Sequence, residues 1–179
     1  MVPSSDYLDA VRARAVAEIQ NRYGLKVVTT DVAAPFTGDL DGVQIVVDYE
    51  LPSDESLFVT VHLFGHSVQW NTDAEAREIG LSPVSIGKVS PETLERHARY
   101  EQGAARYSLQ LLHDIGEHSL DAWLSAFAAA DVAYLFHYYE TGEKLPWRGF
   151  WNDDTPVLTP VAIPPFAPRV WASRSGVVV

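Results

Sequence analysis

LFVTVHLFGHSVQW, residues 57–70, is the stretch that decides the fold. It is apolar almost throughout and long enough for a helix, which predicts a helix buried at the centre of the domain. His62 and His66 stand four residues apart within it. At that spacing both imidazoles leave the same helix face one turn apart, so the stretch predicts a site where they bind one metal ion.

The residue after the first histidine limits the chemistry of such a site. In zinc metallopeptidases the motif is H-E-x-x-H, and its glutamate is the general base that activates the metal-bound water. Leu63 occupies that position here. Because leucine cannot accept a proton, the stretch indicates a metal site but not the usual mechanism of peptide hydrolysis.

Length and composition exclude several classes of protein. With 179 residues, 47% of them hydrophobic, we expect a single domain over residues 1–179 with a core at about 6–141. The net charge of −11 repels phosphate backbones and anionic lipid, which predicts no direct nucleic-acid partner. There is no cysteine, so a metal must be held by histidine, carboxylate or water. No apolar run reaches membrane-spanning length and the N-terminus lacks an apolar leader, so we expect a cytoplasmic protein without a membrane partner.

The hydrophobic pattern predicts an α+β fold, with a small sheet packed against about four helices. The β-branched runs 25–30 and 42–49 are predicted strands, interpreted as antiparallel neighbours. An amphipathic helix is expected over 6–23, and the helix with the two histidines should begin near residues 53–55. Residues 71–89 are predicted to form a loop, and a short helical turn over 74–79 is compatible with its sequence.

Two long helices and a tail complete the predicted fold. Helices are expected from 91 to 115 and from 119 to 141, and the short connection between them favours antiparallel packing. Residues 142–179 are rich in proline and aromatic side chains. We expect an extended tail that packs back onto the domain, because disordered segments are usually poor in aromatic residues.

Two histidines make an incomplete site, since catalytic zinc takes three protein ligands and a water. Glu101 leads EQGAARYSLQLL in the predicted 91–115 helix, with Ala104, Ala105 and Ser108 on neighbouring turns. Small residues would let this helix approach the metal helix, and the cost of burying a glutamate among them would be offset by a cation. Glu101 is therefore the predicted third ligand. The alternatives are an exposed Glu101 paired with His97, and two core imidazoles without a metal.

Both motifs together resemble the ImmA/IrrE-type zinc metallopeptidases. The family's F-T-x-A-H-E-L-G-H motif is matched at Phe58, Thr60, His62, Gly65 and His66. Its E-x-x-A-N-x-F-A-x-x-L-L motif is matched at Glu101, Ala104, Tyr107, Ser108, Leu111 and Leu112. The resemblance implies a minimal zincin-like domain with His62, His66 and Glu101 as metal ligands. The chain departs from the family at Leu63, Phe64 and Ala105, so it resembles a degenerate member without the catalytic glutamate.

Three functions are compatible with this pattern. The first is a metalloenzyme whose chemistry differs from standard peptide hydrolysis, with Zn²⁺ as the expected ion and Fe²⁺ as the alternative. The second is a catalytically silent pseudo-metallopeptidase that regulates or binds a protein partner. The third is a metallopeptidase whose base has moved, for example to Glu50, Glu55 or the 71–89 loop. The substrate would be a small molecule or peptide, and spacing does not select among proton donors such as Tyr107, His113 and His137.

Overall fold

The helix with the two histidines, α2, lies between a small sheet and a pair of long helices. The computed structural model describes residues 3–33 and 36–171 and confirms the predicted α+β class. Its helices are α1 (Ser5–Tyr23), α2 (Ser53–Thr72), α3 (Ala74–Leu81), α4 (Pro91–Asp114), α5 (Asp121–Thr141) and the 3₁₀ helix η1 (Trp147–Phe150). Its strands are β1 (Lys26–Thr30), β2 (Gly38–Leu40) and β3 (Gln44–Asp48).

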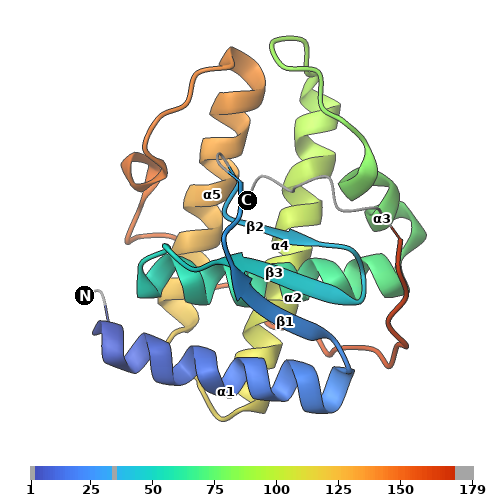
Figure 1. Ribbon diagram of the computed structural model, residues 1–179. Helices are drawn as coiled ribbons and strands as arrows, with labels where there is room; N and C mark the ends of the chain where they lie inside the picture. The colour runs from blue at the N-terminus through green and yellow to red at the C-terminus, as the bar shows by residue number, and fades with distance from the viewer. Residues whose placement is uncertain (1–2, 34–35, 172–179) are drawn as a thin grey trace.

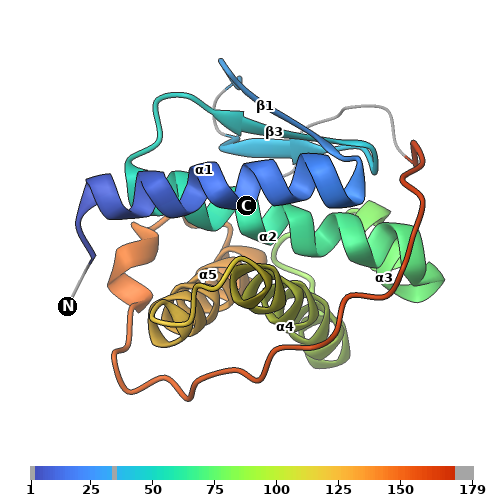
Figure 2. The ribbon, with the colours of Figure 1, turned by 90° about the horizontal axis from the view of Figure 1, so that it is seen from below.

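The elements form three layers (Figure 2): the sheet, then α1 and α2, then α4 and α5. Every residue of α2 from Ser56 to Trp70 is buried, as its apolar pattern predicts. Figure 1 shows α4 and α5 running in opposite directions and diverging toward the end where α4 begins and α5 ends. The layering places the polar residues of α2 in the middle of the molecule, away from bulk water.

The predicted antiparallel pairing of the first and last strands is wrong, because β1 pairs with β3 in parallel. The strand order is β1-β3-β2, with Lys26 opposite Gln44 and Thr30 opposite Asp48. The chain between them contains β2, which makes the antiparallel pair with β3 through the turn at Gly42, where φ is 96°. This hairpin occupies one edge of β3, so β1 joins the other edge.

Residues 71–89 are more ordered than the sequence indicates. The predicted loop 71–89 contains an eight-residue helix, α3, which begins where the Asp73 side chain accepts hydrogen bonds from the backbone of Glu75 and Ala76. Trp171 of the tail contacts this helix, because its ring centre lies 3.9 Å from the guanidinium of Arg77. Residues 172–179 of the predicted tail lie outside the described residues. Within the described ranges, no helix combines the length and apolar character needed to cross a bilayer.

Candidate metal centre

His62 and His66 of α2 and Glu101 of α4 meet in the interior. The Nε2 atoms of the two imidazoles are 3.0 Å apart, and each lies 3.0 Å from Oε2 of Glu101. All three residues are buried, with exposed fractions of 2%, 4% and 8%. The structure therefore brings together the three predicted ligands as a group that could hold a metal ion. The alternative of an exposed Glu101 paired with His97 is wrong.

The close approach of α4 to α2 depends on small residues on both helices. A Cβ atom at Gly65 would overlap the backbone of Ala104, including its carbonyl oxygen. One turn further along α4, the hydroxyl of Ser108 donates to the carbonyl oxygen of Val61 at 2.8 Å. Glu101 lies one turn before Ala104, so this contact brings its carboxylate within reach of both imidazoles.

Gly65→Ala should destabilise the protein and weaken metal binding together. In an ordinary helix interior this change gains about 1 kcal/mol, because alanine has the higher helix propensity. Here the added methyl meets backbone atoms of α4, which cannot rotate away, and we expect a net loss of about 1–3 kcal/mol. Urea denaturation measures the loss, and Gly149→Ala is the control because nothing lies within 4 Å of its Cβ position. A more stable Gly65→Ala protein would contradict the close contact.

Gln69 fixes which ring nitrogen of His66 carries the proton. Its amide nitrogen donates to the carbonyl oxygen of Tyr100 at 2.8 Å, which directs its Oε1 to Nδ1 of His66, also at 2.8 Å. Because an amide oxygen only accepts, Nδ1 of His66 carries a proton and donates. A neutral His66 therefore has its lone pair on Nε2, directed at Glu101 and His62.

This arrangement requires a positive charge between the imidazoles and the carboxylate. Burial raises the pKa of Glu101, but the charge of His66 and the hydrogen bonds from both histidines outweigh it and hold the pKa well below the usual range. An ionised Glu101 and the lone pair of a neutral His66 would both be acceptors and would repel each other at 3.0 Å. Either an added proton or a metal ion removes that repulsion.

The donor atoms suit zinc. Two imidazole nitrogens and one carboxylate oxygen form a three-ligand set found in catalytic zinc sites. Zn²⁺ binds such atoms at about 2.0–2.2 Å, and an ion can reach all three corners of a triangle with 3.0 Å sides. The same set also suits Fe²⁺, so the geometry supports a divalent ion without selecting its element.

Asp131 of α5 is a buried acidic residue near the centre that the sequence analysis missed. It is 6% exposed, and its Oδ2 has no hydrogen-bond partner within the described part of the chain. Burial raises its pKa to about 7, against an opposing effect of His62 and together with repulsion from Glu101. The signal was a single acidic residue in the apolar run AFAAADVAYLF of α5.

A hollow of about 240 Å³ lies beside Asp131. Phe58, Phe127 and Trp147 also line it, and Phe58 stacks on His62 with ring centres 4.9 Å apart. The hollow therefore comes within one aromatic ring of the candidate metal ligands. Its walls are mainly apolar, which is typical of pockets that bind small molecules.

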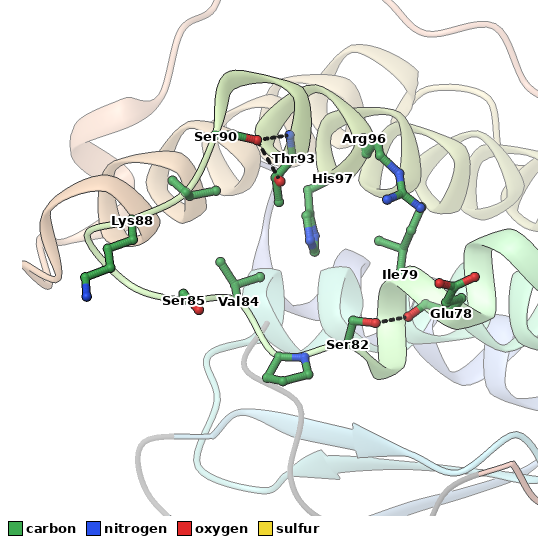
Figure 3. A pocket seen from close by; sticks show the side chains of 12 residues that line it. Glu78, Ile79, Ser82, Val84, Ser85, Lys88, Ser90, Thr93, Arg96 and His97 are labelled. Atoms are coloured by element: carbon green, nitrogen blue, oxygen red, sulfur yellow. Dashed lines mark hydrogen bonds between the residues drawn. The ribbon is translucent and has the colours of Figure 1, made fainter.

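A second hollow, of about 290 Å³, lies between α3, residues 82–90 and the start of α4. Figure 3 shows Arg96 and His97 extending from α4 toward this hollow. His97 is one turn before Glu101, and its ring lies 5.6 Å from that of Tyr139. Both interact electrostatically with Glu101; burial lowers the pKa of His97 and raises that of Tyr139. His97 and Tyr139 are therefore close enough to the candidate metal centre to affect Glu101, which their positions in the sequence did not indicate.

Other residues considered from the sequence have partners of their own. His113 contacts Asp121 at 2.8 Å, and the ring nitrogen of His137 contacts Thr141 at 3.4 Å. Glu55 accepts hydrogen bonds from Trp147 and Arg148. Two further candidates lie elsewhere: Glu50 is exposed, and Tyr107 lines a hollow with Gln69.

Leu63 is fully buried and faces the sheet. A Cβ atom at Gly38 of β2 would lie 2.8 Å from Cδ1 of Leu63, so the leucine side chain reaches this strand. The position that carries the base in H-E-x-x-H is thus filled by a packed hydrocarbon.

Comparisons of the chain with protein-family models, curated proteins and solved structures found no match.

Proposed function

We propose that the protein is a metal-dependent enzyme in which His62, His66 and Glu101 hold a single divalent ion. Zn²⁺ is the ion that we expect first. The observation that carries the proposal is the meeting of their three ligand atoms at 3.0 Å from one another in the interior. A buried ionised carboxylate beside two imidazoles is costly without a compensating cation. The resemblance to ImmA/IrrE-type peptidases supports the same three ligands.

The reaction is not peptide hydrolysis by the usual H-E-x-x-H mechanism. Three protein ligands would leave a position on a bound ion for water or substrate, where a zinc ion would supply Lewis-acid chemistry. Leu63 cannot take a proton from that water, and Glu55 is engaged by Trp147 and Arg148. The proposed substrate is a small molecule or a short peptide that enters from the hollow beside Asp131.

A catalytically silent metallopeptidase is the second candidate, and the packing of Leu63 favours it. A buried leucine fixed against Gly38 has replaced the base while the ligand group remains. Such a protein would use the metal to stabilise a surface for a protein partner.

Metal content tests the proposal. Protein purified without added metal and then equilibrated with Zn²⁺ should retain one ion per chain after gel filtration, measured by elemental analysis. His62→Ala and Glu101→Gln should each retain far less under the same conditions, because each removes one of three protein ligands. Zinc retained equally by all three proteins would place the ion elsewhere and reject this site.

Leu63→Glu separates the two candidates. If the chain is a silenced peptidase, this change should create zinc-dependent cleavage of an unfolded protein substrate, and Leu63→Gln, which cannot act as a base, should not. We expect no cleavage from either variant, because the reaction proposed here does not use this position. Zinc-dependent cleavage by Leu63→Glu alone would favour the silent peptidase. Circular dichroism must show that both variants fold, since each buries a polar group where Leu63 is fully buried.

A further inference from the structure

Two buried polar atoms near the centre lack partners within the residues described, and they complement each other. They are Nδ1 of His62 and Oδ2 of Asp131. When Nε2 of His62 offers its lone pair to a metal, Nδ1 carries the proton and needs an acceptor. A carboxylate oxygen is such an acceptor.

Contacts one turn away on each helix bring Asp131 into the neighbourhood of His62. The rings of Phe58 and Phe127 stack at 3.9 Å and join α2 to α5. His62 lies one turn after Phe58, and Asp131 lies one turn after Phe127. Asp131 also interacts electrostatically with both His62 and Glu101, so the two helices bring this carboxylate close to the candidate centre.

We infer that Asp131 is the positioning residue of His62, the carboxylate that accepts the hydrogen bond of its Nδ1 once a metal ion occupies the site. The inference rests on the proposed metal site. Asp131 lines the 240 Å³ hollow, but its Oδ2 and Nδ1 of His62 are both shielded from solvent, so each needs a partner within the protein. His66 already has the equivalent partner, because Oε1 of Gln69 accepts from its Nδ1 at 2.8 Å.

The two partners together orient both ligands. A histidine that donates its second N–H to an acceptor keeps one tautomer and one ring orientation, and its ligating nitrogen becomes more basic. Gln69 does this for His66 from the same helix, whereas Asp131 does it for His62 from α5. Metal affinity therefore depends on α5, which contributes none of the three ligands.

In the metal-free protein this role has a cost, because burying a carboxylate without a direct partner destabilises a fold. Replacing it by a neutral side chain of similar size should therefore leave the metal-free protein at least as stable at neutral pH, while metal affinity falls. A residue with a purely structural role would lower stability when replaced.

The test compares Asp131→Leu, which has no acceptor atom, with the wild type and with Asp121→Leu. Asp121 is a carboxylate on the same helix that contacts His113 instead of the candidate centre. Zn²⁺ dissociation constants are measured by competition with a chromophoric chelator, and the stability of each metal-free protein by urea denaturation. We expect Asp131→Leu to bind Zn²⁺ about 10–100-fold more weakly without loss of metal-free stability, and Asp121→Leu to bind like the wild type.

The outcomes separate this inference from the proposed function. A wild type that binds no Zn²⁺ overturns the metal site itself. A wild type that binds Zn²⁺ while Asp131→Leu binds within threefold of it overturns only the role of Asp131. An equal loss of affinity in Asp121→Leu also overturns that role, since any change of charge on α5 would then have the same effect.

Discussion

His66→Ala should abolish the stabilisation that Zn²⁺ gives the wild type. An ion that binds only the folded state at a thousand times its dissociation constant adds about 4 kcal/mol to the free energy of unfolding. For a chain of 179 residues this corresponds to a rise in melting temperature of about 8–16 °C. With one of three ligands removed, we expect the difference between zinc-loaded and chelator-treated protein to fall close to zero.

Each variant must be compared with itself, with and without metal. His66 is buried against Tyr100, with ring centres 4.4 Å apart, so its removal also leaves a cavity that lowers the melting temperature regardless of zinc. His113→Ala is the matched control, because it removes a histidine of α4 that contacts Asp121 and should keep the full zinc effect. A wild-type melting temperature that is the same in Zn²⁺ and in chelator would contradict the prediction.

The ligand group was predictable because each signal was local to one helix. The spacing of His62 and His66 fixes their common face once a helix is assumed, and the buried run around them made that assumption safe. Glu101 was identified by the small residues that follow it. The contact of Gly65 with Ala104 shows why this worked, since a larger residue at position 65 would hold the helices apart.

Asp131 could not be assigned a role from sequence because its neighbours come from another helix. A lone aspartate in an apolar helix is a visible anomaly, but its partner depends on how α5 crosses α2. The stack of Phe58 on Phe127 is a contact at that crossing, and no pattern in either helix specifies which aromatic side chains will meet. The orientation of β1 was missed for a related reason: β2, the strand that makes the hairpin with β3, is only three residues long and lacks a β-branched residue.

The metal-free protein should become less stable between about pH 4 and pH 7 because of Asp131. Burial raises the pKa of this carboxyl from 3.8 to about 7 in the folded protein, so the folded state binds more protons than the unfolded state in this range. Stability then falls as pH rises through the window and is constant outside it. A shift of this size corresponds to roughly 4 kcal/mol, because each pKa unit is worth about 1.4 kcal/mol.

Asp131→Asn isolates this contribution, since it removes the titrating group but keeps the shape. Other titrating groups that interact with Asp131 are His62, Glu101, Tyr134 and Tyr139, and all four remain in the variant. Relative to the wild type, the variant should gain roughly 4 kcal/mol between pH 4 and pH 8, measured by urea denaturation of metal-free protein. Asp131→Leu, which also lacks the carboxyl, must show the same pH dependence. If the difference between wild type and variant is the same at both pH values, the carboxyl ionises as freely as in water and has no buried interaction with the centre.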